Sequence, residues 1–205
     1  DLVVRVPRHP RLGETILGNE FRTFPGGKGA NQAVTAARLG GMVRMIGRVG
    51  NDGFGSALIK TVSADGVDTR HILVDDQAAT GVALITVDES GQNSIVVASG
   101  ANGRVTPEQV RESKAAFEGA SVLLLQLECP LVAIQEAIQI AVERGLQVIL
   151  NPAPAQPLPA ELLPKVDYLI PHQTELTLLA YPGQSNPPDD LNEAVRRVLA
   201  MGVKH

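Results

Sequence analysis

The sequence has no tryptophan, one cysteine and few aromatic residues. Aromatic residues make up 3% of the 205 residues, so a site that stacks a base or a sugar ring has few candidates, which argues against a nucleoside substrate. Cys129 is the only cysteine, which excludes an internal disulfide and a cysteine-rich zinc site and fits a reducing compartment. We interpret Cys129 as a buried small residue rather than a nucleophile.

Long apolar runs and clusters of like charge are also missing. No stretch approaches the roughly 20 apolar residues of a membrane span, and no basic region followed by a hydrophobic segment opens the chain. The formal net charge is −4 and no run of Lys or Arg exceeds two residues, so neither nucleic acid nor a membrane is an expected partner. Small-molecule chemistry in the cytoplasm is therefore the expectation.

The first hundred residues combine strand signals with two helices. Segments 2–24 and 81–98 contain β-rich runs around polar turns and are predicted to pair as a small β lid, because they alternate like half-exposed strands. Small residues recur at helical spacing from Gly29 to Leu39, which predicts a helix that can pack very close to a sheet. A second helix is predicted from Phe54 to Ala64.

The second half alternates strands with helices. This alternation predicts a mostly parallel central sheet with helices on both faces, within one α/β domain spanning 1–205. The predicted strands are Val122–Leu127, Gln147–Leu150 and Tyr168–Ile170, and the predicted helices are Leu131–Arg144, Thr174–Ala180 and Asp189–Met201.

Polar residues directly follow the three predicted parallel strands. Glu128 follows the first strand, Asn151 the second, and the cluster from His172 to Glu175 the third. Ligands of open parallel sheets sit outside the carboxyl ends of the strands, so we expect a cleft there.

A glycine motif, Gly-Gly-Lys-Gly-Ala-Asn-Gln at 26–32, lies between an extended run and the first helix. It has neither the P-loop spacing nor GxGxxG, which disfavours a dinucleotide-binding dehydrogenase. A tight turn into a closely packed helix is one interpretation. Lys28 and Asn31 favour a ligand site, because they are three residues apart on the first helical turn and can reach the same molecule.

This motif resembles the first signature of the ribokinase family of sugar kinases, also called PfkB carbohydrate kinases. Further motifs similar to the family follow in the expected order along nearly the whole chain: Gly13-Glu14-Thr15, Gly50-Asn51-Asp52-Gly53-Phe54-Gly55, Thr80-Gly81-Val82-Ala83, Gln126-Leu127-Glu128, Asn151-Pro152-Ala153-Pro154-Ala155 and Thr174-Glu175. The resemblance implies a ribokinase-like α/β fold with a β lid over the sugar. It also implies ATP-dependent phosphorylation of D-ribose at the 5-hydroxyl, with Mg²⁺ required and a monovalent cation, usually K⁺, as activator. A homodimer through the lid strands is implied in the same way.

The resemblance also implies roles for single residues. Asp1, Gly27, Lys28, Asn31 and Glu128 would contact the sugar. This agrees with the chemistry, because discrimination among neutral polyols needs charged or amide groups in fixed geometry.

Two further residues would face the ATP and metal side. Glu175 would act on Mg²⁺ through water. His172 takes the place of an Asn in the family's Asn-x-x-Glu pattern, and it is the candidate nucleotide contact.

The second family signature, a Gly-Ala-Gly-Asp run that supplies the anion hole and the catalytic base, does not occur between residues 1 and 205. We therefore expect a truncated domain whose base lies beyond His205 and which is inactive alone. Two alternatives stay open. One is a related kinase for fructose, a deoxy sugar acid or a nucleoside, and the other is a non-catalytic sugar-binding relative.

Overall fold

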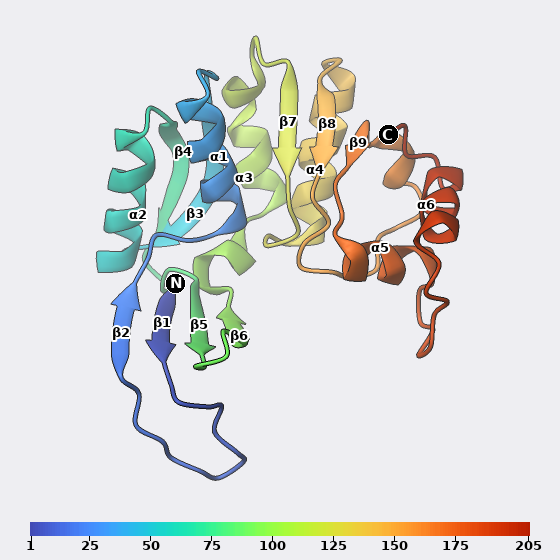
Figure 1. Ribbon diagram of the computed structural model, residues 1–205. Helices are drawn as coiled ribbons and strands as arrows, with labels where there is room; N and C mark the ends of the chain where they lie inside the picture. Colours follow the sequence, from blue (N-terminus) through green and yellow to red (C-terminus); the bar gives the residue numbers. More distant parts are fainter. The chain divides into compact units, whose positions relative to one another are not determined.

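The computed structural model describes residues 1 to 205. The chain forms two compact units, Asp1–Arg104 and Val105–His205, where the sequence predicts a single domain. The first unit contains two of the three sheets and the second unit contains the third. No strand pairs with a strand of the other unit. Figure 1 gives the element labels.

Four strands of the first unit form one mixed sheet in the order β2-β1-β5-β6. Strand β1 runs antiparallel to β2 and parallel to β5, and β5 and β6 form a hairpin. The sheet therefore joins the two segments that the sequence predicts to pair, and Figure 1 shows it projecting from α1, α2, β3 and β4. Its strands are β1 (Leu2–Arg5), β2 (Glu20–Thr23), β5 (Val82–Val87) and β6 (Asn93–Ala98).

The connection between β1 and β2 is a long loop rather than a tight turn. An ion pair joins Arg8 to Glu14 inside it, and the same carboxylate accepts from the backbone N–H of Arg11 at 2.9 Å. Strand β2 begins after this loop, at Glu20, near the end of the segment 2–24 that is predicted to supply lid strands.

The second sheet of the first unit is the parallel pair β3 (Arg44–Gly50) and β4 (Asp68–Asp75). Helices α1 (Lys28–Arg38) and α2 (Gly53–Ala64) pack against it. A small apolar core of Ala33, Val62 and Val67 lies between these elements, as the small residues of α1 predict. A short 3-10 helix, η1 (Gly100–Arg104), closes the unit.

The second unit contains the all-parallel sheet β7-β8-β9. Its hydrophobic core excludes water, since four of its side chains are fully buried: Ile138, Val148, Leu150 and Val166. Strand β7 ends at Leu125, two residues earlier than predicted. The elements are α3 (Pro107–Glu112), η2 (Lys114–Phe117), β7 (Val122–Leu125), α4 (Leu131–Glu143), β8 (Gln147–Leu150), η3 (Leu163–Lys165), β9 (Tyr168–Leu169), α5 (Gln173–Ala180) and α6 (Leu191–Ala200).

Helices α5 and α6 pack on each other around a second apolar cluster, which includes Leu179, Tyr181, Ala194 and Val198. The Arg197 guanidinium lies 4.6 Å from the centre of the Tyr181 ring, so it covers the ring as a cation–π partner. None of the helices combines the length and the apolar character that crossing a membrane requires.

Candidate functional site

The carboxylate of Asp1 lies against Gly26. A Cβ atom added to Gly26 would lie 2.3 Å from Asp1 Oδ1 and 2.6 Å from Oδ2, so only glycine leaves room for this carboxylate. Asp1 is fixed by its backbone as well, because its amino nitrogen donates to the Phe24 carbonyl at 2.8 Å and its carbonyl accepts from the Phe24 N–H at 2.9 Å. The first unit therefore has a half-buried carboxylate next to the residues that directly precede α1.

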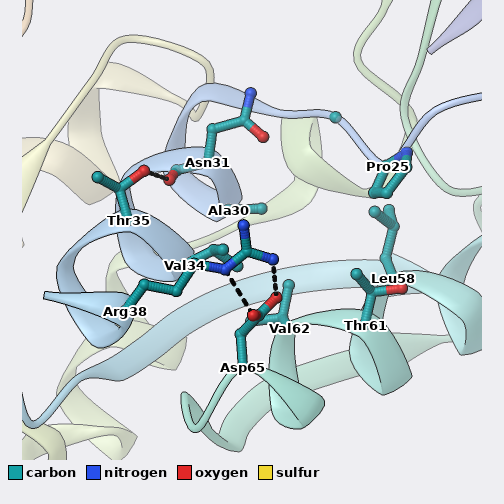
Figure 2. A pocket seen from close by; sticks show the side chains of 11 residues that line it. Pro25, Ala30, Asn31, Val34, Thr35, Arg38, Leu58, Thr61, Val62 and Asp65 are labelled. Atoms are coloured by element: carbon teal, nitrogen blue, oxygen red, sulfur yellow. Dashed lines mark hydrogen bonds and ion pairs between the residues drawn. The ribbon is translucent and has the colours of Figure 1, made fainter. Parts of the chain in front are cut away.

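Gly27, Lys28 and Asn31 form the start of α1. Gly27 is the N-cap residue with φ of 92°, a conformation that favours glycine, and no side chain caps the helix there. Lys28 and Asn31 lie on the first turn, as their spacing predicts, and both are exposed. The backbone carbonyl of Asn31 accepts from the Thr35 hydroxyl at 2.7 Å. Figure 2 shows its side-chain amide directed away from the ion pair further along the helix.

A cavity of about 300 Å³ lies between α1 and α2, next to this helix start. Apolar side chains such as Val34 and Leu58 line it. Arg38 of α1 and Asp65, the C-cap residue of α2, pair across it through bonds of 2.7 Å and 3.1 Å (Figure 2). Because the two charges satisfy each other, the cavity offers little free charge to a ligand.

A smaller cavity of about 160 Å³ lies beside Asp1. It is enclosed by aromatic and aliphatic side chains of β1, β5, α2 and the segment before α1, among them Leu2, Phe24, Phe54, Leu58 and Val82.

Glu128 and Cys129 follow β7 in the second unit. The segment is tied to the loop after β8, since the Leu127 N–H donates to the Ala153 carbonyl at 2.8 Å. Glu128 is half-buried. Burial, with a smaller contribution from the Glu128 charge, raises the pKa of the Cys129 thiol to about 11. The thiol therefore stays protonated at neutral pH and is a poor nucleophile.

Asn151, after β8, has a structural contact. Its side-chain amide donates to the Ile170 carbonyl at 2.8 Å and so links the ends of β8 and β9. Of the polar residues that follow the parallel strands, Asn151 therefore has a structural role, because it holds neighbouring strand ends together.

His172 and Glu175 begin helix α5. Glu175 is buried, at 5% exposure, and one of its oxygens accepts from the His172 N–H at 2.9 Å. The other oxygen lies 3.6 Å from Nε2 of His172, whose ring is exposed. One carboxylate oxygen therefore caps the helix. No group of three or more His, Cys, Asp or Glu side chains in residues 1–205 could hold a metal ion.

The predicted site residues divide between the two units. Asp1, Gly27, Lys28 and Asn31 belong to the first, where they gather at the start of α1, and Glu128, His172 and Glu175 belong to the second. Sequence reasoning gave no role to Gly26. The paired glycines before the helix were the available signal, but their sequence does not distinguish the glycine that the carboxylate contacts from its neighbour.

Comparison with known proteins places these features in a family. The model of the pfkB family carbohydrate kinases matches residues 1–205. The ribokinase of Haemophilus influenzae is 45% identical over 179 residues, which cover 87% of this chain and 58% of that protein. The ribokinase of Bacillus subtilis is 42% identical, with coverage of 87% and 61%. The chain thus spans about three fifths of the length of these two relatives.

A solved structure gives the same assignment at the level of the fold. The structure of Arabidopsis thaliana ribokinase complexed with ribose and ATP is 31% identical and superposes with a TM-score of 0.82, covering 99% of this chain and 66% of that chain. The predicted ribokinase-like α/β fold is confirmed. With the family model matched from the first residue to the last, this chain belongs to the pfkB family of carbohydrate kinases.

Proposed function

We propose that the protein containing this chain transfers the γ-phosphoryl group of ATP to the 5-hydroxyl of D-ribose. The observation that carries the proposal is the Asp1 carboxylate packed against Gly26, directly before the turn of α1 that bears Lys28 and Asn31. The names of the relatives, ribokinases, and the ribose and ATP named for the Arabidopsis structure support it.

The residues at the start of α1 suit a neutral polyol. A carboxylate accepts two or more hydroxyl hydrogens, an ammonium group donates, and an amide does both, so together they can satisfy hydroxyls in fixed geometry. Gly27 brings backbone close to the same place because it has no side chain. Glu128, half-buried after β7, is the proposed sugar ligand from the second unit.

The ATP side of the site is assigned to the start of α5. Mg²⁺ would neutralise phosphate charge, and we propose that Glu175 acts on it through water with the oxygen that does not cap the helix. His172 replaces the family's Asn here, and we propose that its exposed ring contacts the nucleotide. K⁺ is the proposed activating cation. The catalytic base is assigned to a Gly-Ala-Gly-Asp segment outside residues 1–205.

The four-stranded sheet β2-β1-β5-β6 is the proposed lid. Both of its faces carry apolar side chains: Val3 and Ile85 lie on one face, and Leu84 and Val96 on the other, as the strand registers require. A sheet that is apolar on both faces has two surfaces to cover. We assign one face to the sugar and propose that a second copy of the chain covers the other, giving a homodimer through the lid strands.

A sugar panel tests the proposal. The gene product that contains residues 1–205 is assayed with Mg-ATP and K⁺ by coupled ADP detection, using ribose, 2-deoxyribose, fructose, a deoxy sugar acid and adenosine. Ribose should give the highest kcat/KM. Another preferred acceptor would move the protein to a related kinase activity. Ribose binding by calorimetry with no ADP release would identify a non-catalytic sugar-binding protein.

A further inference from the structure

Strands β5 and β6 are joined to the rest of the first unit by two short segments. Residues 76–81 lead from β4 into β5, and residues 99–104 lead from β6 through η1. Thr80 lies in the first segment, just before β5, and is buried at 6% exposure. Its side chain is therefore shielded from water at the place where the proposed lid leaves the body of the unit.

Thr80 holds this segment to the start of α2 by hydrogen bonds from backbone and side chain. Its N–H donates to Asp52 Oδ2 and its hydroxyl donates to Asp52 Oδ1, each at 2.7 Å. The hydroxyl oxygen also accepts from the Gly50 N–H at 2.9 Å. Asp52 is at the same time the N-cap of α2 and accepts from the Gly55 N–H at 2.8 Å. One threonine thus connects the end of β3, the cap of α2 and the root of β5.

The backbone around Thr80 is packed too closely for side chains. A Cβ on Gly50 would lie 2.4 Å from the Thr80 nitrogen, and one on Gly55 would lie 2.9 Å from its hydroxyl oxygen. On the opposite side, a Cβ on Gly100 would lie 2.4 Å from the Ala79 carbonyl. The two connecting segments are themselves joined, because the Ala101 N–H donates to that same carbonyl at 2.8 Å.

A second anchor holds the other end of these segments. Asp75, the last residue of β4, is buried, and its Oδ2 pairs with Arg48 of β3 at 2.7 Å and with Arg104 of η1 at 2.8 Å. Its Oδ1 accepts from the Gln77 N–H at 2.7 Å. The incoming and outgoing segments are therefore both fixed to the parallel pair, and only Gly81 separates Thr80 from the first residue of β5.

We propose that Thr80 is a positioning residue for sugar binding, which sets where the β5–β6 hairpin stands relative to Asp1 and α1 by fixing its root to Asp52 and Gly50. The inference rests on the proposed function, in which this sheet covers the sugar. In this proposal Thr80 does not itself contact the sugar. It acts because β5 lies beside β1 in the same sheet, so a change at the root of β5 is passed to β1, which Asp1 directly precedes.

Thr80→Val tests the proposal, because the valine side chain keeps the shape but neither donates to Asp52 Oδ1 nor accepts from the Gly50 N–H, while the backbone N–H still donates to Asp52 Oδ2. We expect KM for ribose to rise about tenfold, since buried polar groups lose their partners. KM for ATP should stay within about twofold, since Thr80 is placed on the sugar side only. Thr80→Ser, which keeps the hydroxyl, should restore KM for ribose. Thr61→Val is the matched control, because the Thr61 hydroxyl donates only within α2, to the Ala57 carbonyl.

Hydrogen exchange separates this inference from the proposed function. Without ribose, the β5 and β6 amides of Thr80→Val should exchange about tenfold faster than those of the wild type, while β7 and β8 are unchanged. This readout remains decisive even if the wild type phosphorylates no ribose, an outcome that refutes the proposed function alone.

Two outcomes would overturn the inference. The first is a Thr80→Val protein with wild-type KM for ribose and wild-type exchange in β5 and β6. If this variant fails to fold, Asp52→Asn replaces it, because the amide keeps an acceptor for Gly55 but cannot accept from the Thr80 N–H. Failure of both variants to fold would also refute the inference, since Thr80 would then be a requirement of the whole unit.

Discussion

Replacing Gly26 by alanine should weaken ribose binding without disturbing the backbone. The φ angle of Gly26 is outside the left-handed region, so alanine can adopt its backbone conformation. The obstacle is the added Cβ, which would lie 2.3 Å from Asp1 Oδ1 and 2.5 Å from Asp1 Cγ. Ordinary contacts begin near 3.4 Å, so the carboxylate has to move by about 1 Å.

The size of the effect follows from the hydrogen bonds that this movement breaks. A hydrogen bond to a charged group contributes about 1.5 to 3 kcal/mol. A shift of about 1 Å takes a ribose hydroxyl out of range of the carboxylate, since bonds from a hydroxyl to a carboxylate span only about 2.5 to 2.7 Å. One lost bond corresponds to a dissociation constant about 10- to 150-fold higher.

Calorimetry with ribose on Gly26→Ala, Asp1→Ala and the double variant measures this directly. If Gly26→Ala acts through Asp1, it should cost little further affinity once the carboxylate is gone. Gly53→Ala is the control, because a Cβ there meets nothing within 4 Å. Wild-type affinity in Gly26→Ala, or full additivity in the double variant, would refute the reasoning.

Four further results are expected. Asn31→Ala should weaken ribose binding by about 1 to 3 kcal/mol, because hydroxyl partners are left unpaired, and unchanged affinity in calorimetry would remove Asn31 from the site. Residues 1–205 alone should release no ribose-dependent ADP, and a rate near that of a longer gene product would show that the base is misplaced. Ile138→Ala should lower the free energy of unfolding in urea by about 2 to 5 kcal/mol, whereas Val132→Ala, on the exposed side of α4, should change it little. Hydrogen bonds from Thr80 and Gly55 hold the pKa of Asp52 below its ordinary value, so stability should fall as pH drops below about 4 and Asp52→Asn should flatten that dependence in urea titrations.

Local patterns predicted most of the elements. The continuous apolar run of β7 and the amphipathic α4 are signals carried within one segment, so the βαβ unit was predicted from the sequence and its parallel pairing is confirmed. The length of the loop before β2 was not predicted. The Arg8–Glu14 ion pair holds part of this segment in a loop, and the residue types alone do not show that these two side chains meet. The parallel pairing of β1 with β5 joins segments about 80 residues apart and leaves no local signal.

The candidate site divides in the same way. Lys28 and Asn31 were named because they share one helical turn, and both lie on the first turn of α1. Gly27, the N-cap of that helix, was named through the family resemblance. Glu175 was named as a residue of the metal side, yet one of its oxygens caps α5. The Thr-Glu pair in the sequence is compatible with either role, so the sequence alone could not identify the cap.

The contacts missing from the sequence reasoning lie at the connections of the four-stranded sheet. At the connection from β2 to α1, the Asp1 carboxylate rests on Gly26, and at the root of β5 the Asp52 carboxylate binds Thr80 beside Gly50. In both places a carboxylate contacts a residue from a distant segment where a glycine leaves room, and these contacts fix where the sheet meets the helices. The first contact also positions Asp1, which is proposed to bind the sugar. The position of the proposed lid and the position of the Asp1 carboxylate are therefore linked. Thr80→Val should therefore change KM for ribose together with the exchange of the amides of the proposed lid, whereas Gly26→Ala should change KM for ribose alone, and both should leave KM for ATP nearly unchanged.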